Sequence, residues 1–327
     1  MPKSSNQKLK LLYLLKILME QTDEQHPMST AALIGALSSY SVSAERKSIY
    51  SDIEELIFFG IDIEKKGGRE KSGYYIASRN FELAELKLLV DAVQSSKFMT
   101  GKTTEQLIRK LGALTNQYDA VKLNRQVFVA NRNKTQNESV LYNIDDIHRA
   151  IQENHKIEFQ YFEWSVQKKL VARKKGAVYQ MSPLALIWDD ENYYLVAYDT
   201  EMKMRKHFRV DKMKHISILE EKIDTDTDRT LDIAAYSKSM FGMFGGEAAD
   251  VTLRCPNHKI GILFDRFGTD ISVRQLDDSF CRIRILVAVS EQFFGWLSSI
   301  GTDVTILSPD SVKCEYREYL ENILANY

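Results

Sequence analysis

The side chains of this chain that could do chemistry are cations and aromatic rings, and they gather in a few short stretches. One stretch presents Arg46, Lys47 and Tyr50 at the spacing of a single helix face. Arginine and lysine contact DNA phosphates and base edges, so such a face could lie in a major groove. More cations follow further along the chain, around a Gly-Gly turn, at Lys65, Lys66, Arg69 and Lys71.

Two further basic clusters lie near the middle of the chain. Residues 168–175 hold five Lys or Arg and no acid, and residues 203–215 hold six against Asp211. Cations hold phosphate in a salt-dependent way, and aromatic rings stack on bases. We expect these clusters to bind an anionic effector derived from nucleic acid, either a short single strand or a nucleotide. The expected effector-binding residues are Tyr161, Tyr194, Arg205, His207, Arg209 and Lys212.

Strand alternation places Arg205, His207 and Arg209 on one face of their strand. Either His207 joins the two arginines in a pocket, or all three side chains face solvent. The competing interpretation assigns Tyr161 and Phe208 to the core of the domain and the lysine cluster to a solvated loop.

Catalytic motifs are absent from the sequence. It contains no P-loop, no GxSxG elbow, no HExxH and no paired Cys/His signature, and its 6 histidines are scattered. Cys255, Cys281 and Cys314 are far apart and form no CxxC pair, which argues against a disulfide framework and a zinc site. We therefore expect that the protein is not an enzyme and that it binds no cofactor and no metal ion.

Length and composition describe an ordinary globular protein of two or three domains, with 327 residues, 44% hydrophobic and 27% charged. No apolar run approaches the roughly 20 residues of a membrane span. The first residues lead into a lysine-bearing amphipathic helix that does not resemble a secretion signal, so we expect a cytoplasmic protein. Residues 1–80 carry 11 Lys or Arg against 10 Asp or Glu. Because this excess is small, we expect a homodimer that reads two half-sites.

A winged helix-turn-helix over residues 1–80 would position the first cations. Ser29 is expected to cap one helix, and Ser43 a second helix whose stripe is Ile49, Ile53, Leu56 and Ile57. Gly60 ends that helix, and strands 61–64 and 73–76 then flank the basic turn. The expected DNA-binding residues are Ser29, Thr30, Ser43, Arg46, Lys47, Tyr50, Lys65, Lys66, Arg69 and Lys71.

The rest of the chain divides into four parts. Residues 81–142 are expected to be a helical connector, with helices opened by Asn80 and by a Thr103–Gln106 capping box. Five short strands, at 156–162 and around 178–181, 185–188, 193–198 and 205–210, predict a small β-barrel over 143–220. Residues 221–247 are expected to be a linker, and the β-α-β-β-α-β pattern of 248–327 predicts a ferredoxin-like domain. The predicted fold class is thus α+β, with several domains.

This organisation resembles the bacterial WYL-domain transcriptional regulators over nearly the whole chain. The segment 46–53, RKSIYSDI, is similar to the family's recognition helix, with Ser51 where an arginine is common. The barrel matches at 157–161, 182–184, 193–198 and 208–213, with Tyr193 in place of the namesake Trp. Segments 265–268 and 296–301 resemble the C-terminal extension called WCX. The resemblance implies an Sm-like barrel that senses a ligand, in some members single-stranded DNA.

We therefore expect a transcriptional regulator whose barrel modulates operator binding. One alternative is an accessory protein, for example in phage defence, that binds single-stranded nucleic acid through the barrel. Another is a regulator that senses a small metabolite.

Overall fold

A computed structural model describes residues 7–68, 72–123, 134–224, 232–243 and 245–327. The chain forms two compact units, Met1–Gln136 and Asn137–Tyr327. Both helices and antiparallel sheets are present, so the protein is a mixed α/β protein. Among the described residues, no helix has the length and apolar character needed to cross a membrane.

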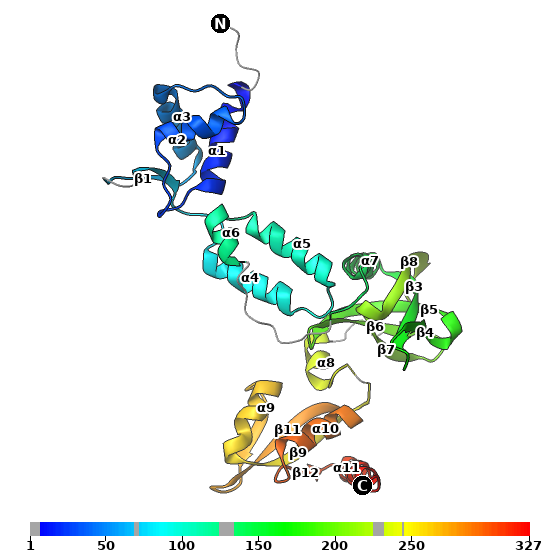
Figure 1. Ribbon diagram of the computed structural model, residues 1–327. Helices are drawn as coiled ribbons and strands as arrows, with labels where there is room; N and C mark the ends of the chain where they lie inside the picture. Colours follow the sequence, from blue (N-terminus) through cyan, green and yellow to red (C-terminus); the bar gives the residue numbers. More distant parts are fainter. Residues whose placement is uncertain (1–6, 69–71, 124–133, 225–231, 244) are drawn as a thin grey trace. The chain divides into compact units, whose positions relative to one another are not determined.

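Three helices and a hairpin open the first unit, in the order that the sequence predicts (Figure 1). A 3-10 turn, Gln7–Leu9, leads into α1 (Lys10–Gln21), followed by α2 (Thr30–Ser38), α3 (Arg46–Phe59), β1 (Ile63–Lys66) and β2 (Gly73–Ile76). Leu14, Leu33 and Ile49 come from the three helices and are completely buried against one another. Burial of these apolar side chains is what holds the helices together.

Backbone contacts attach the hairpin to the start of α2. Met28 and Tyr74 exchange two hydrogen bonds, with N···O distances of 2.9 and 2.8 Å. A side chain on Gly73 would place its Cβ 2.3 Å from the carbonyl of Met28, so only glycine fits there. Gly60, with a φ of 106°, ends α3 in a left-handed conformation and turns the chain toward β1.

Helix starts in this region confirm one prediction and correct another. The Ser29 hydroxyl accepts a hydrogen bond from the amide of Ala32 at 3.2 Å, as expected of a cap. Ser43 does not cap α3, because the chain remains extended to Glu45 and the helix begins at Arg46. Ile57 is 48% exposed, so the buried stripe of α3 ends at Leu56.

Three more helices complete the first unit: α4 (Leu83–Ser95), α5 (Gly101–Gly112) and α6 (Gln117–Leu123). Asn80 does not open α4; Glu82 caps it, in a reciprocal capping box with Glu85. Thr103 is likewise inside α5, and the hydroxyl of Thr100 accepts from its amide at 3.2 Å. In both helices a better-placed cap lies a few residues from the expected one.

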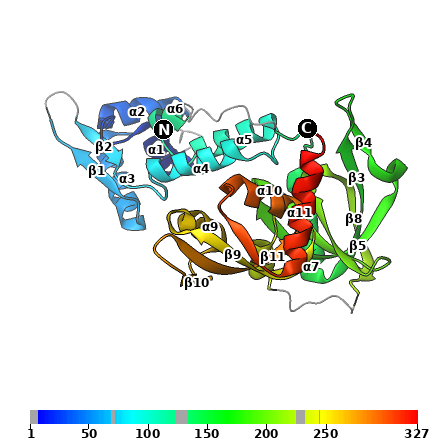
Figure 2. The ribbon, with the colours of Figure 1, turned by 90° about the horizontal axis from the view of Figure 1, so that it is seen from below.

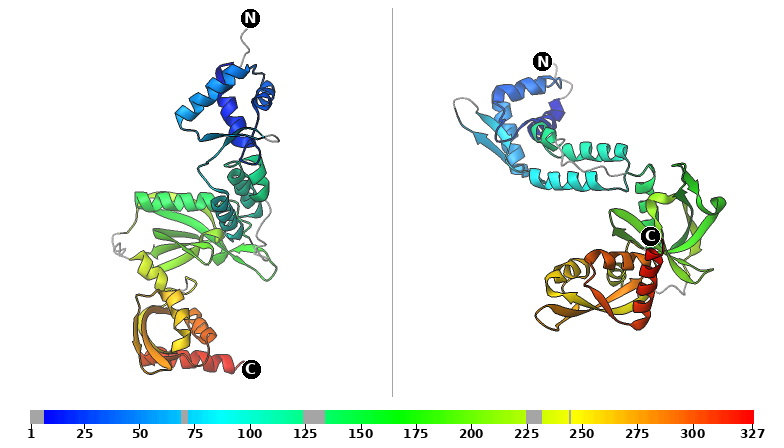
Figure 3. Two further views of the ribbon diagram at one scale, coloured as in Figure 1. Left: turned by 90° about the vertical axis from the view of Figure 1, so that its left-hand side faces the viewer. Right: turned by 60° about the horizontal axis from the view of Figure 1, so that its bottom comes forward.

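A sheet of six antiparallel strands dominates the first half of the second unit. Its strands are β3 (His155–Trp164), β4 (Leu170–Ala172), β5 (Val178–Asp189), β6 (Asn192–Asp199), β7 (Met204–Arg209) and β8 (Met213–Lys222). They are ordered β4-β3-β5-β6-β7, and β8 also pairs with β3. Helix α7 (Val140–Glu153) packs on β3, β5 and β8 (Figure 3).

Three strands in this sheet differ from the prediction. The expected strands 178–181 and 185–188 are one strand, β5, whose pairing shifts between Pro183 and Ala185. Proline cannot donate to a ladder, and the bulge lets one long strand bend and pair with both β3 and β6. Strands β4 and β8 were not anticipated, since the first has only 3 residues and the second is rich in charge.

The expected linker, residues 221–247, is partly structured. Strand β8 runs to Lys222, and helix α8 (Ile233–Ser239) follows. Met240 and Met243 are buried with Tyr194, at 4%, 4% and 9% exposure. The described part of this segment therefore packs against the six-stranded sheet.

The C-terminal part has the predicted β-α-β-β-α-β order. Its elements are β9 (Glu247–Pro256), α9 (Ile260–Phe267), β10 (Ser272–Gln275), β11 (Phe280–Val289), α10 (Glu291–Ile300), β12 (Thr305–Ser308) and the final helix α11 (Asp310–Leu324). The four strands form an antiparallel sheet ordered β10-β11-β9-β12. Figure 2 shows α10 and α11 beside this sheet, and their apolar side chains share its core.

Two cysteines that are distant in sequence meet in this sheet. Cys255 on β9 lies directly opposite Cys281 on β11, and both are buried free thiols. Burial raises the pKa of Cys255 to about 11, which keeps its thiol protonated. Cys314 is exposed on α11.

Candidate functional site

The first half of α3 and the hairpin share a ridge of cations and aromatic rings. Arg46 donates from Nε to the Tyr50 hydroxyl at 2.8 Å. The ring centroids of Tyr50 and Tyr74 are 6.4 Å apart, and Lys65 Nζ lies 5.6 Å from the Tyr74 centroid. We call these four residues, together with the exposed Lys47, the α3–hairpin ridge.

Neighbouring side chains hold the residues of the α3–hairpin ridge in place. Hydrogen bonds from Thr30 and then from Arg46 lower the pKa of Tyr50. Thr30 is 8% exposed, so it supports the ridge more than it presents a surface of its own. On the other side of α3, Lys10 forms an ion pair with Asp52 at 2.7 Å that ties α1 to α3.

The other expected DNA-binding residues are distributed around this ridge. Ser29 and Ser43 are exposed. Lys66 is partly engaged, because its Nζ donates to the carbonyl oxygen of Glu24 at 2.9 Å. Arg69 and Lys71 lie outside the described residues.

A second cationic group surrounds Tyr161 on the six-stranded sheet. The Tyr161 hydroxyl accepts from the backbone amide of Arg209 at 3.3 Å, and its ring packs edge-on against Phe208. Arg209 is held by both oxygens of Asp211, at 3.0 and 2.9 Å, and by the side-chain oxygen of Asn192 at 3.0 Å. This pairing fixes the guanidinium of Arg209 in place and also offsets part of its positive charge.

Electrostatics around Tyr161 show that several cations are close together. Burial, followed by the charge of Arg209, lowers the pKa of Lys212, while Asp211 and Glu163 act in the opposite direction. Arg173, which lies 3.8 Å from Glu163, lowers this pKa as well. Burial raises the pKa of Tyr161 to about 12, so the phenol stays neutral. We call Tyr161, Arg173, Arg209 and Lys212 the Tyr161 cluster. Arg173 was within the expected basic stretch but was not singled out.

Of the remaining expected effector residues, Tyr194 lies directly opposite Arg209 in the sheet, whereas Arg205 and His207 contact another element. His207 Nε2 is 2.9 Å from the Tyr236 hydroxyl, and the Arg205 guanidinium lies 5.6 Å from the centroid of that ring. Both side chains are therefore in contact with α8, whereas Arg209 is held by Asp211 and Asn192, so the three side chains are not all free in solvent. Tyr194 is buried in the cluster with Met240 and Met243. Sequence periodicity could not show this, because it does not reveal which distant helix covers a strand.

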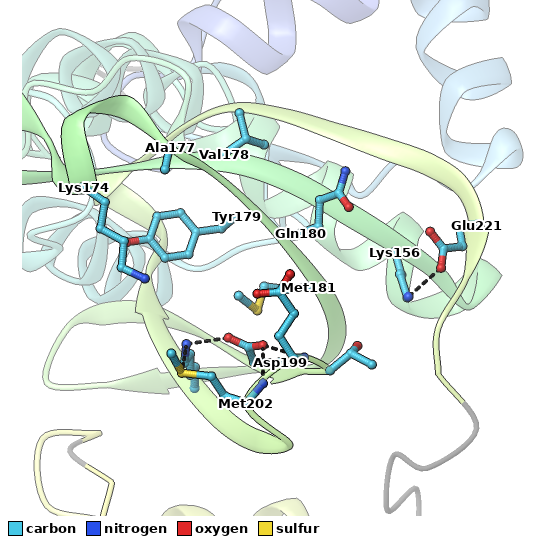
Figure 4. Close-up of a pocket in the computed structure, with 13 residues that line it drawn as sticks. Lys156, Lys174, Ala177, Val178, Tyr179, Gln180, Met181, Asp199, Met202 and Glu221 are labelled. Carbon is cyan, nitrogen blue, oxygen red and sulfur yellow. Dashed lines mark hydrogen bonds and ion pairs between the residues drawn. The ribbon is translucent and has the colours of Figure 1, made fainter.

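A hollow of about 390 Å³ beside β5 and β6 was not anticipated (Figure 4). Its lysines are mostly neutralised: Lys206 meets Asp199 at 2.5 Å, and Lys156 meets Glu221 at 2.6 Å. Tyr179 lines the hollow, and its buried hydroxyl has no hydrogen-bond partner among the described residues. Such an atom is a candidate contact for a polar ligand group.

Metal chemistry finds no support in the geometry of the described residues. No group of three or more His, Cys, Asp or Glu side chains there could hold a metal ion.

Comparison with known proteins identifies two domains. Residues 142–218 match the model of the WYL domain, and residues 247–324 match the model of the WCX domain. No curated protein matches the sequence.

Two solved structures are similar to the chain. One is proteasome accessory factor B/C (PafBC) of Arthrobacter aurescens, with 17% identity and a TM-score of 0.29, covering 99% of this chain and 49% of that one. The chain thus spans about half the length of that protein. The other is described as a CRISPR Cas-related protein, with 13% identity and a TM-score of 0.35, covering 94% of this chain and 97% of that one.

Proposed function

Because the chain belongs to the WYL-domain family and carries a WCX domain after its WYL domain, we propose that it is a DNA-binding transcription regulator. In this proposal residues 1–80 are a winged helix-turn-helix that binds an operator, and 81–142 are a connector. Residues 143–220 are an Sm-like barrel that senses an anionic effector, 221–247 join the domains, and 248–327 are the C-terminal extension.

The α3–hairpin ridge is the observation that supports DNA binding most strongly. A recognition helix contacts base edges with its N-terminal residues, and Arg46, Lys47 and Tyr50 occupy the first half of α3. Lys65 continues the cationic surface onto the hairpin, where a wing contacts phosphate. The folded core alone does not require this cation-rich arrangement, since Arg46 and Lys47 are exposed.

Acidic residues confine the proposed DNA-contacting surface of α3 to the first half of the helix. Glu54 and Glu55 are exposed in the second half of α3 and would repel phosphate. One copy of the ridge therefore offers only a few phosphate contacts. We accordingly include in the proposal a homodimer that places two copies on two half-sites.

The Tyr161 cluster is the proposed effector site. The positive charges of Arg209 and Arg173 act on Tyr161, and Lys212 is held in a partly buried place where its positive charge is disfavoured. A negatively charged ligand would relieve that cost, because it favours the charged form of the lysine. A ring beside cations also suits a base with its phosphate.

A ligand-response assay tests the proposed function. The wild-type protein is first used to select a duplex from a random-sequence pool, and oligothymidylate is then added to the labelled complex. We expect the duplex affinity to change by about fivefold or more, the lower range of allosteric coupling. Arg173→Ala with Lys212→Ala should bind the duplex normally and lose this response.

Two cations outside the expected clusters serve as the control for charge loss. Arg149 on α7 and Lys222 on β8 are exposed, and Arg149→Ala with Lys222→Ala also removes two cations. That variant should respond as the wild type does. An undiminished response in the Arg173/Lys212 variant, or no response of the wild type, would refute the proposed effector site.

A further inference from the structure

Three arginines form a row across the sheet of the C-terminal domain. Arg282 on β11 lies directly opposite Arg274 on β10 and directly opposite Arg254 on β9. Neighbouring strands are about 4.8 Å apart, so the row spans roughly 10 Å. Arg284 is two residues along β11 on the same face.

This arginine face is opposite the core of the domain. On β11 the alternate residues Cys281, Ile283 and Ile285 are buried with apolar residues of α9 and α10. Arg274, Arg282 and Arg284 are exposed on the other face. They line a hollow of about 420 Å³ together with hydroxyl groups of Thr252, Ser272 and Ser308 and one acid, Asp250.

The cations of this face are incompletely neutralised. Asp250 binds Arg284 through both oxygens, at 3.2 and 2.9 Å. Arg254 has its guanidinium 3.3 Å from the centroid of the Phe280 ring. In the described part of the chain, neither Arg274 nor Arg282 forms an ion pair.

Packing and folding do not account for such a row. Like charges placed directly opposite each other on a sheet destabilise it. Within the row itself, Arg274, Arg282 and Arg254 follow one another on three adjacent strands with no acid between them. A protein can retain such a destabilising arrangement when the side chains are needed for binding.

We propose that this face of the WCX domain binds the phosphates of single-stranded nucleic acid, at a site separate from the Tyr161 cluster. The row is long enough to meet more than one phosphate, and the three hydroxyl residues can donate to phosphate oxygens. The stacked pair of Arg254 and Phe280 adds planar surface at the edge of the row, of the kind on which bases stack.

A single strand fits this face better than a duplex does. The surface is a sheet with short side chains between its arginines, and it has no helix or ribbon that could enter a groove. Four-stranded sheets of this β-α-β-β-α-β type can present their open face to single strands.

Strand binding by the full-length protein tests the proposal. The anisotropy of labelled oligothymidylate is measured with wild type and with Arg274→Ala plus Arg282→Ala. Both are also compared in the Arg173→Ala plus Lys212→Ala background, in which the proposed effector site cannot mask the effect. Loss of two charged contacts should weaken binding about tenfold or more. The slope of log K against log salt should become shallower by about 1.4, because each phosphate contact contributes about 0.7 for single strands.

Stability provides a second readout that separates binding from folding. Because the substitution removes like-charge repulsion, the double variant should melt at or above the wild-type temperature. Arg317→Ala, on α11 of the same domain, is the control, since it removes an exposed arginine that lies 3.7 Å from Glu321. That variant should bind the strand as the wild type does.

The outcomes distinguish this site from the proposed effector site. In the Arg173/Lys212 background, equal strand binding with and without the Arg274/Arg282 substitutions would overturn the proposal, even if the Arg173/Lys212 variant had lost its response. Weakened binding by the Arg274/Arg282 variant, with duplex affinity unchanged, would support it whatever the Arg173/Lys212 variant does. Inorganic phosphate is tested as a competitor. Full competition by millimolar phosphate would show a simple anion site and would also overturn the proposal.

Discussion

His207 is a histidine whose charged form the fold disfavours. Its Nε2 is 2.9 Å from the Tyr236 hydroxyl of α8. Burial, followed by the charge of Arg205, lowers its pKa from 6.5. The side chain is therefore protonated less readily than a free histidine, and it attaches α8 to β7.

This lowered pKa predicts a dependence of stability on pH. Below 6.5 the unfolded chain binds a proton at this position more readily than the folded chain does, so stability falls as pH is lowered. His207→Gln keeps a polar partner for Tyr236 but cannot titrate. The difference in unfolding free energy between wild type and variant, measured by urea titration from pH 5 to 7, should shrink or reverse toward low pH. A difference that stays constant would contradict this assignment.

The hairpin and α2 depend on each other through one glycine. Gly73→Ala would bring a Cβ within 2.3 Å of the Met28 carbonyl, so the backbone must shift and the paired amides of Met28 and Tyr74 must separate. We expect a local destabilisation of about 1–3 kcal/mol, as for other overpacked sites. Faster amide hydrogen exchange in peptides that contain these residues would show it.

A second glycine in the same unit provides the control. A Cβ on Gly35 of α2 meets nothing within 4 Å, and alanine favours a helix by about 1 kcal/mol. Gly35→Ala should therefore slow exchange in α2 or leave it unchanged. Equal exchange in Gly73→Ala and wild type would show that the close approach at Met28 is not needed.

At the scale of helices and strands, the sequence predicts where an element begins or ends better than which distant element it contacts. The Ser29 cap and the stop at Gly60 depend on neighbouring residues and are confirmed. Ser43 and Thr103 fail as caps because other residues at nearby positions start the helices. The contact of α8 with His207 depends on chain folding across about thirty positions, which no periodicity encodes.

At the scale of the whole molecule, the positions of the charged side chains matter more for binding than the net charge. The formal net charge is only −1, yet cations meet on the α3–hairpin ridge, around Tyr161 and on the arginine face. Binding of nucleic acid depends on the charges at the contact surface, so a near-neutral protein can still bind it. The arginine face was not predicted from the sequence, because Arg254 and Arg282 become neighbours only through strand pairing.

Replacement of Arg46 and Lys47 tests the central claim, that the α3–hairpin ridge binds duplex DNA. A mobility-shift titration compares wild type with Arg46→Ala plus Lys47→Ala. The control is Arg109→Ala plus Lys110→Ala, which removes an exposed arginine–lysine pair from the last turn of α5. The account predicts that duplex binding is lost only in the Arg46/Lys47 variant, with its circular dichroism spectrum unchanged. Binding equal to wild type in that variant, or equal loss in the control, would contradict the account.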